Sequence, residues 1–298
     1  MHALICVSAL CFLLVDAYPR THRPKAVTCE HVVIFGDSLT DDGVEAEGSS
    51  HGFNRYSNGP VWAEYLNNML ECVKYDNYAY AGATSGMDNF YFPGWSGVLW
   101  QVTNFLTTTP VISEDTLIIV QLGGNNDMFN GENKTTVIAE NARRAVTNLA
   151  LHGARKVLAL NLVDLSEAPG VQNADGGGEI GKWISLLTSE ANMRLRSTLY
   201  NRHDGITITF PRLDFKLFDF NGALAEANSH FMNVSEPYTH HRPDTSPSDI
   251  NYFAFHDLFH PSTPSDINYF AFHDLFHPST FVHYKLAQAI LRFLQDWV

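Results

Sequence analysis

The sequence has little positive charge and no sign of a break between domains. Its 298 residues contain 19 Lys and Arg against 32 Asp and Glu, which gives a formal net charge of −13. An acidic surface repels phosphate backbones and anionic membranes, so the composition argues against a nucleic-acid-binding protein. No run of Pro, Gly or Ser and no block of like charge marks a linker, and we therefore expect a single domain.

Long apolar runs are also scarce, and the clearest one lies at the N-terminus. Residues 3–15 are apolar apart from one Ser, and small residues at Val15 and Ala17 suit a signal peptidase. The run is too short to span a bilayer stably. We predict a signal peptide over residues 1–17, with a buried N-terminal helix as the alternative. Residues 18–298 would then form a secreted, extracellular protein without an integral membrane span.

Cysteine is rare, and two of the four cysteines lie in the predicted signal peptide. Cys29 and Cys72 remain, an even number for an oxidising compartment. The sequence leaves open whether they form a disulfide or stay as two buried thiols. The triplets that begin at Asn133 and Asn233 have the glycosylation pattern Asn-x-Ser/Thr, so both asparagines are candidate glycosylation sites.

Apolar patterns predict strands and helices that alternate along the chain. Strands are expected over residues 31–35, 73–80, 116–122, 156–162 and 206–210, and helices over residues 60–71, 135–152, 180–202 and 281–297. This alternation predicts a parallel sheet covered by helices on both faces. In such sheets the chemistry lies beyond the carboxyl ends of the strands. Three of the predicted strands lead directly into Ser38, Gly82 and Asn126.

Ser38 is the candidate nucleophile. It follows the first predicted strand and the dipeptide Gly36-Asp37. A serine hydroxyl is a weak nucleophile at neutral pH, and it needs a base within hydrogen-bond reach and donors for the oxyanion that forms. A sharp turn after a strand exposes the hydroxyl and can aim the Ser38 amide at that oxyanion. The alternative is a serine that caps a helix.

The candidate base lies near the C-terminus, where Asp274 precedes His277 by three residues. Pro278 disfavours a helix at His277, so the pair is expected in a turn. There the carboxylate can hold one imidazole nitrogen and leave the other free to accept a proton.

The same motif occurs twice because residues 247–263 and 264–280 are identical in sequence. The first copy supplies an alternative pair, Asp257 and His260. A perfect tandem copy is not a solenoid and indicates a recent duplication or an error in the gene sequence. Each copy also has two histidines four residues apart, as in zinc-binding helices. The glutamate of such helices is missing and a proline follows the second histidine, so we predict no metal site.

Gly82 and Asn126 are candidate oxyanion donors. A glycine at a strand end can present its amide without steric hindrance, and an asparagine side chain offers an NH₂ group. With the Ser38 amide they would supply three donors. Taken singly, Gly82 also fits a turn glycine and Asn126 an Asx turn.

Four motifs in this order resemble those of the GDSL esterase/lipase family, also called SGNH hydrolases. The matches are Phe35-Gly-Asp-Ser-Leu-Thr-Asp-Asp-Gly43, Asn77-Tyr-Ala-Tyr-Ala-Gly-Ala-Thr84, Gly124-Asn-Asn-Asp127 and Asp274-Leu-Phe-His-Pro278. Two further stretches, residues 55–62 and 153–157, look like segments common in secreted plant and fungal members. The resemblance runs from about His31 to the C-terminus.

The resemblance implies a flavodoxin-like, three-layer α/β/α sandwich with a mostly parallel five-stranded sheet. It also implies a triad of Ser38, His277 and Asp274, oxyanion donors at Ser38, Gly82 and Asn126, and an acyl-enzyme mechanism that needs no cofactor. In the family this motif leads directly into the last helix. Only the second copy does so here, which favours His277 over His260.

The substrate is expected to be a small-molecule, lipid or polysaccharide ester, and the sequence shows no obligate protein partner. The aromatic stretch over residues 90–95 either lines a cleft for an acyl chain or a sugar, or packs in the core. The absence of an obvious apolar lid favours short-chain or acetyl esters. Two other functions remain open, namely an acyltransferase with the same triad and a non-catalytic secreted binding protein of the same fold.

Overall fold

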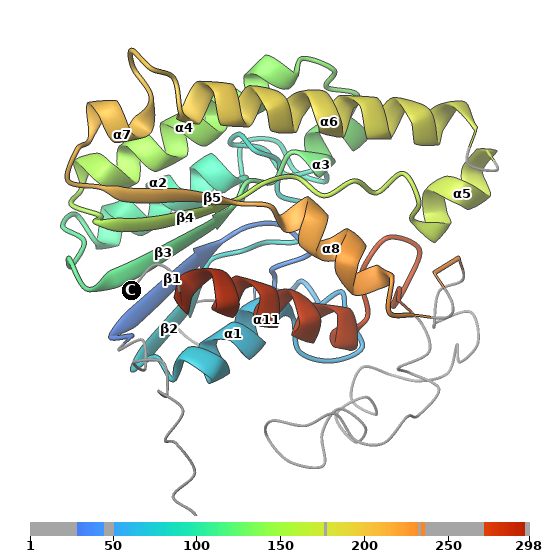
Figure 1. The fold of residues 1–298 in the computed structure, drawn as a ribbon, viewed down its shortest axis with the longest axis horizontal. Coiled ribbons are helices and arrows are strands. Elements are labelled where there is room, and N and C mark those ends of the chain that lie inside the picture. The colour runs from blue at the N-terminus through green and yellow to red at the C-terminus, as the bar shows by residue number, and fades with distance from the viewer. Residues whose placement is uncertain (1–28, 45–50, 176–177, 232–233, 236–270, 296–298) are drawn as a thin grey trace, which may run out of the picture.

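The computed structural model describes residues 29–44, 51–175, 178–231, 234–235 and 271–295, and the described strands form one parallel sheet. The strands are β1 (His31–Phe35), β2 (Lys74–Asn77), β3 (Thr116–Gln121), β4 (Lys156–Leu160) and β5 (Asp214–Phe218). Their order is β2-β1-β3-β4-β5, and every neighbouring pair is parallel (Figure 1). This is the strand order of flavodoxin-like folds. The predicted fold class is thereby confirmed.

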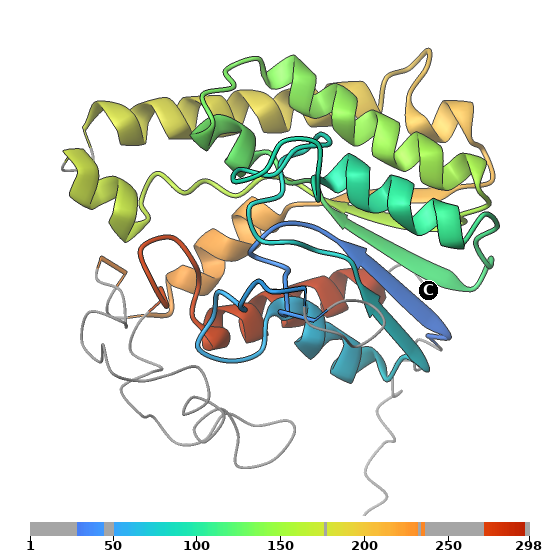
Figure 2. The same ribbon diagram turned by 180° about the vertical axis from the view of Figure 1, so that it is seen from behind.

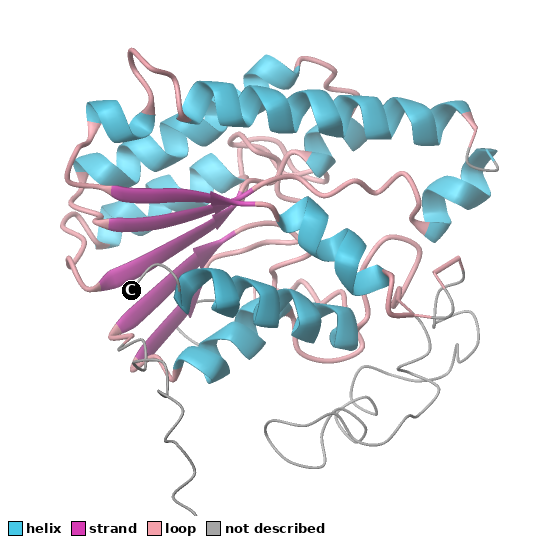
Figure 3. Ribbon diagram, in the orientation of Figure 1, coloured by secondary structure: helices cyan, strands magenta, loops and turns pink. Residues whose placement is uncertain are grey.

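Helices cover both faces of the sheet (Figures 1 and 2). One face carries α2 (Val98–Thr108), α4 (Thr135–Leu151), α6 (Glu179–Leu199) and the short α7 (Ile206–Thr209). The other face carries α1 (Trp62–Leu70), α8 (Phe220–Asn228) and α11 (Thr280–Gln295). Two short helices, α3 (Asn125–Phe129) and α5 (Pro169–Asp175), follow strands β3 and β4. Figure 3 shows the sheet between the two helical layers.

Alternate residues of the central strands supply the two cores. In β1, Val33 and Phe35 pack with α2, whereas Val32 and Ile34 pack with α1 and α11. All four side chains are fully buried. Successive side chains of a strand point to opposite faces, so a strand covered on both sides must be apolar throughout. This explains the apolar runs over residues 32–35 of β1 and 117–120 of β3.

One predicted strand is wrong. Residues 206–209 form helix α7, and the fifth strand is Asp214–Phe218 instead. Ile206 is buried, but Ile208 is 56% exposed, so the segment does not present alternate side chains to a sheet. The edge strand that pairs with β4 is β5, in which charged Asp214 and Lys216 alternate with Phe215. Edge strands tolerate such charges because one side of the strand faces solvent.

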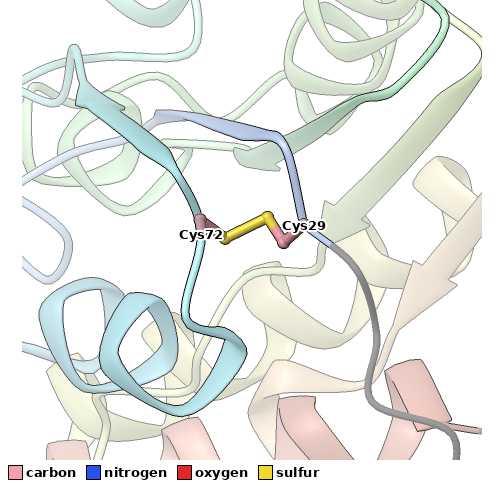
Figure 4. Close-up of a disulfide and its surroundings, with 2 residues drawn as sticks. All are labelled: Cys29 and Cys72. Carbon is pink, nitrogen blue, oxygen red and sulfur yellow. A yellow bond between two sulfur atoms is a disulfide. The ribbon is translucent and has the colours of Figure 1, made fainter.

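Cys29 and Cys72 form a disulfide, with their Cα atoms 4.5 Å apart (Figure 4). They lie just before β1 and β2, and the backbone N–H of Val73 donates to the Cys29 carbonyl oxygen at 3.0 Å. The bridge thus ties together the amino ends of two neighbouring strands, at the edge of the sheet opposite the strand ends that carry the candidate site.

Several expectations lie outside the described residues. These are the signal peptide over residues 1–17, the candidate glycosylation site at Asn233, and the first repeat copy with Asp257 and His260. Within the described ranges, no helix is both long and apolar enough to cross a membrane. Asn133 is exposed and lies two residues before the start of α4.

Candidate active site

Four segments meet beyond the carboxyl ends of the strands. Three of them follow β1, β2 and β3 and carry Ser38, Gly82 and Asn126, and the fourth is the loop before α11, which carries His277. The four residues line one cavity of about 350 Å³. Parallel strands end at the same edge of a sheet, which brings residues distant in sequence into one site.

Ser38 lies in a tight turn and not at the start of a helix, so the helix-cap alternative is wrong. The turn is closed by the backbone N–H groups of Thr40 and Asp41, which both donate to the Asp37 carbonyl oxygen at 2.9 Å. The Gln121 side chain, from β3, accepts from the Asp37 N–H at 2.8 Å and donates to the Asp37 carboxylate at 3.0 Å. The nucleophile turn is therefore fixed to the buried sheet.

The Asp37 carboxyl group is almost completely buried, at 1% exposed. Burial raises its pKa to about 6, against the opposing effect of hydrogen bonds from Gln121 and the Leu39 amide. The position of this residue in the turn makes it a structural anchor. It contacts neither the Ser38 hydroxyl nor the His277 ring through any hydrogen bond between described residues.

Ser38, His277 and Asp274 form a connected row of hydrogen bonds. The Ser38 Oγ lies 2.8 Å from His277 Nε2. His277 Nδ1 lies 2.9 Å from each carboxylate oxygen of Asp274. Burial pushes the pKa of Asp274 upward, but the hydrogen bond and charge of His277 and two backbone N–H donors outweigh it and lower the pKa to about 2. Asp274 is therefore ionised at neutral pH and can orient the imidazole.

The loop that carries His277 is held at both ends. Phe272 and Pro278 form an antiparallel bridge, and the His273 N–H donates to the His277 carbonyl oxygen at 2.7 Å. At the start of α11, the Thr280 N–H donates to the Asn58 side chain at 2.7 Å. Asn58 belongs to the stretch over residues 55–62, so part of that stretch serves to anchor the loop of the candidate base.

Tyr56 is a site residue that the sequence did not single out. Its ring lies over the His277 imidazole, with ring centroids 4.7 Å apart and planes inclined by 31°. An aromatic face attracts a cation, so this contact favours the imidazolium form that appears during proton transfer. Tyr56 also lines the cavity. Its position next to Arg55 in a polar stretch gave no signal of this role.

Ser38, Gly82 and Asn126 each have an N–H donor at the cavity. Neither the Ser38 amide nor the Gly82 amide donates a hydrogen bond to any residue that the structure describes. The Asn126 Nδ2 donates one hydrogen to the Ala83 carbonyl oxygen at 2.9 Å, which orients the group and leaves its second hydrogen available. The three predicted oxyanion donors thus lie around one cavity.

The remaining cavity wall is mostly apolar. The apolar side chains that line it are Leu39, Phe90, Tyr91, Phe129, Leu165 and Phe276. Phe129 and Phe276 meet edge to face, with ring centroids 5.7 Å apart. Only the aromatic stretch over residues 90–95 was a candidate wall from the sequence. Phe276 lies within the motif that carries His277, and Phe129 lies two residues after the motif that carries Asn126, but nothing in the sequence indicates which way their rings point.

The described residues contain no group of three or more His, Cys, Asp or Glu side chains placed to hold a metal ion. The pair His273 and His277, four apart in sequence, does not lie on a helix. His277 instead contacts Ser38 and Asp274, so the zinc-helix interpretation of the second repeat copy does not match its geometry.

Comparison with known proteins gives the family of the chain. The model of the GDSL-like Lipase/Acylhydrolase family matches residues 32–290. Among curated proteins, phosphatidylcholine-sterol acyltransferase from Aeromonas hydrophila is 30% identical over 187 residues, which cover 57% of this chain and 53% of that protein. The chain therefore spans about half the length of this curated relative.

Similar solved structures include a member of the lipolytic protein G-D-S-L family from Veillonella parvula, with 17% identity, a TM-score of 0.48, and coverage of 88% of this chain and 96% of that one. The psychrotrophic esterase EstA from Pseudoalteromonas sp. has 14% identity, a TM-score of 0.43, and coverage of 90% and 98%. The family match spans all four motifs of the site, and the chain belongs to the GDSL-like lipase/acylhydrolase family.

Proposed function

We propose that this protein is a serine ester hydrolase that cleaves carboxylic esters through an acyl-enzyme on Ser38. The observation that carries the proposal is the hydrogen-bonded row from Ser38 Oγ through the His277 ring to Asp274, at 2.8 Å and 2.9 Å. A nucleophile, a base and a group that orients the base, each within hydrogen-bond distance of the next, satisfy the geometric requirement for nucleophilic catalysis.

In the first half of the reaction, Ser38 Oγ attacks the ester carbonyl carbon while His277 Nε2 takes the hydroxyl proton. The carbonyl π electrons move to oxygen, and this oxyanion accepts hydrogen bonds from the Ser38 and Gly82 amides and the Asn126 NH₂ group. The intermediate collapses, the bond to the alkoxy oxygen breaks, and His277 gives its proton to the departing alcohol. The product of this half is an acylated Ser38.

In the second half, water takes the place of the alcohol. His277 removes a proton from the water as its oxygen attacks the acyl carbon, and the same three donors stabilise the second oxyanion. When the bond to Ser38 Oγ breaks, His277 returns the proton to the serine and the carboxylic acid leaves. Asp274 holds the imidazole in the tautomer that presents Nε2 to Ser38 throughout.

The cavity lining supports an ester with an apolar acyl group. Phe90, Tyr91, Phe129 and Phe276 offer aromatic surface next to the nucleophile. Burying an additional methylene group there is worth about 0.8 kcal/mol. The sequence instead favoured a short-chain or acetyl ester. Rates for a series of p-nitrophenyl esters of increasing acyl chain length distinguish a preference for short acyl groups from a preference for longer ones.

An acyltransferase is the second candidate, and one observation favours it. The curated relative that shares 30% identity over 187 residues is named a phosphatidylcholine-sterol acyltransferase. The same triad passes an acyl group to an alcohol if the alcohol replaces water in the second half of the reaction. The alcohol must then compete with water in a cavity whose wall is mostly apolar.

We also propose that the protein is secreted after removal of residues 1–17 and glycosylated at Asn133. The apolar N-terminal run and the exposed sequon support this proposal. A band shift on treatment with an N-glycosidase, lost in Asn133→Gln, together with N-terminal sequencing of the mature protein, tests it.

The test of the function is hydrolysis of p-nitrophenyl esters by the mature protein beside Ser38→Ala and His277→Ala. Both variants are expected to lose about a thousandfold or more in kcat, the scale found when triad members are removed. His260→Ala, the matched change in the other repeat copy, is the control and is expected to retain activity. An added alcohol that captures the acyl group in preference to water would establish the transferase.

The outcomes separate the candidates. A folded wild-type protein that is no more active than Ser38→Ala on every ester, and that does not react with a fluorophosphonate, would exclude both enzymatic functions. A noncatalytic binding protein would then be the remaining interpretation. Activity lost in His260→Ala and kept in His277→Ala would preserve the mechanism but assign the base to the first repeat copy.

A further inference from the structure

The Gly82 amide owes its direction to a side chain that the proposed mechanism does not use. The peptide group between Ala81 and Gly82 has its carbonyl oxygen at one end and the Gly82 N–H at the other. In a planar trans peptide the two point in opposite directions. Whatever fixes the Ala81 carbonyl therefore also fixes the direction of the Gly82 amide.

Asn89 fixes that carbonyl. Its Nδ2 donates to the Ala81 carbonyl oxygen at 2.7 Å and to Ser96 Oγ at 2.9 Å, and its Oδ1 accepts from the Tyr91 N–H at 2.9 Å. The side chain is 3% exposed. With both polar atoms of its amide engaged at a buried position, Asn89 holds one orientation.

Asn89 also packs closely against Gly82. A Cβ atom on Gly82, whose φ is +79°, would come within 2.6 Å of Asn89 Oδ1. The Ala81 N–H is held separately, since it donates to the buried Asp41 carboxylate at 2.6 Å. Hydrogen bonds thus hold both backbone groups of Ala81, the carbonyl oxygen through Asn89 and the N–H through Asp41, which lies just after the nucleophile turn.

We propose that Asn89 is the positioning residue for the oxyanion site, because its hydrogen bond to the Ala81 carbonyl aims the Gly82 amide into the catalytic cavity. The inference rests on the proposed function, which makes Gly82 an oxyanion donor. Asn89 touches neither the cavity nor the reacting atoms and acts only through the peptide that it holds.

Asn89 also immediately precedes the aromatic stretch over residues 90–95. The Asn89 N–H donates to the Phe92 carbonyl oxygen at 2.8 Å, and the Phe90 N–H donates to the Gly82 carbonyl oxygen at 2.6 Å. Phe90 and Tyr91 then line the cavity. An acyl chain packed against these two rings therefore rests on the segment that aims the oxyanion donor, so Asn89 couples recognition of the acyl group to catalysis.

Asn89→Asp tests this arrangement with little change in shape. The carboxylate still accepts from the Tyr91 N–H, but its second oxygen faces the Ala81 carbonyl oxygen, and the two repel. Misaiming one oxyanion donor is expected to lower kcat for p-nitrophenyl butyrate about 10- to 100-fold, with KM within about threefold, because the donor acts in the transition state. Asn104→Asp, the same change at an exposed position of α2, is the control and is expected to stay within twofold.

A spectroscopic measurement follows the Gly82 amide itself. Ala is followed by Gly at position 81 alone in the whole sequence. Protein labelled with ¹³C at alanine carbonyls and ¹⁵N at glycines therefore gives one HNCO signal, that of the Ala81–Gly82 peptide. We expect this signal to shift when a fluorophosphonate labels Ser38. In Asn89→Asp we expect the chemical shift of this signal to differ from that of the wild type before the fluorophosphonate is added, and to change less when Ser38 reacts.

A folded Asn89→Asp protein with kcat within threefold of the wild type, or with a raised KM at unchanged kcat, would overturn the proposal. So would an Ala81–Gly82 signal that moves no more in Asn89→Asp than in Asn104→Asp. If Asn89→Asp does not fold, Asn89→Ala removes the same bond without adding charge and is judged by the same criteria. If the wild type neither hydrolyses esters nor reacts with the fluorophosphonate, the proposed function fails. The HNCO signals of wild type, Asn89→Asp and Asn104→Asp without fluorophosphonate then still show whether Asn89 positions the Ala81–Gly82 peptide.

Discussion

The candidate site has two halves that are built differently. Ser38, Gly82 and Asn126 follow strands of the sheet, and buried side chains such as Gln121 and Asn89 hold their segments. Asp274 and His277 lie on a loop before α11 and are held by their own backbone, with support from Asn58. The sheet half is thus fixed by tertiary contacts and the loop half mainly by local ones.

The two halves also treat their carboxyl groups in opposite ways. Burial raises the pKa of Asp37, in the sheet half, to about 6. In the loop half, hydrogen bonds and the nearby imidazole outweigh burial and lower the pKa of Asp274 to about 2. The contrast shows that burial alone does not set the charge of a carboxyl group, because the donors and the imidazole charge around Asp274 outweigh its burial whereas the donors around Asp37 do not.

The largest effect is expected in the loop half, for Asp274→Asn. An amide cannot stabilise the imidazolium and favours the wrong imidazole tautomer, so kcat should fall by about 10³- to 10⁴-fold. Steady-state hydrolysis of p-nitrophenyl butyrate measures this loss. Asp257→Asn, the identical substitution in the first repeat copy, is the matched control and should leave kcat unchanged. Equal losses in both variants would mean that the two copies share the task.

A somewhat smaller effect is expected in the sheet half, for Gly82→Ala. The new Cβ would meet Asn89 Oδ1 at 2.6 Å, so the peptide that offers the Gly82 amide must move. Loss of one oxyanion donor should lower kcat about 10²- to 10³-fold.

Gly94→Ala is the control, because Gly94 also has a positive φ, of +70°, but open space where the Cβ would lie. Strain alone should destabilise both variants by about 1–2 kcal/mol in urea unfolding. A large loss of kcat in Gly94→Ala would show that backbone strain lowers the rate. An unchanged kcat in Gly82→Ala would show that the direction of the Gly82 N–H does not control the rate.

The sequence could predict the site residues of both halves and the parallel sheet that carries one of them. Short motifs identified Ser38, Gly82, Asn126 and His277, because each lies next to a strand end or a proline that fixes its local structure. The parallel sheet followed from apolar runs in β1 and β3, in which every residue except His31 is buried on one face or the other. These signals are local in sequence.

Contacts between distant segments gave no such signal. Tyr56 lies over His277, and the Trp62 N–H donates to His283 Nδ1, although 221 residues separate the members of each pair (277 − 56 = 221). The β-branched residues of 206–209 favour a strand by propensity, yet the pairing of β5 with β4 leaves them in helix α7. Tertiary pairing overrides propensity in short segments.

The smallest effect is a dependence of stability on pH, with opposite sign in the two halves. Asp37 has an ordinary pKa of 3.8 that rises to about 6 on folding. As pH rises from 4 to 6, the unfolded chain ionises this group before the folded protein does. The free energy of unfolding should therefore fall by up to about 3 kcal/mol from this group, and level off above pH 6.

Asp274 works the other way, because folding lowers its pKa from 3.8 to about 2. Its contribution of up to about 2 kcal/mol is present above pH 4 and is lost as pH falls toward 2. Urea unfolding of wild type, Asp37→Asn and Asp274→Asn from pH 3 to pH 7 separates the two, because other groups cancel in each difference from wild type. The stability of wild type relative to Asp37→Asn should fall between pH 4 and 6, and relative to Asp274→Asn it should fall only below pH 4. Two differences with the same sign would mean that burial governs both carboxyl groups, and the contrast between the two halves would not hold.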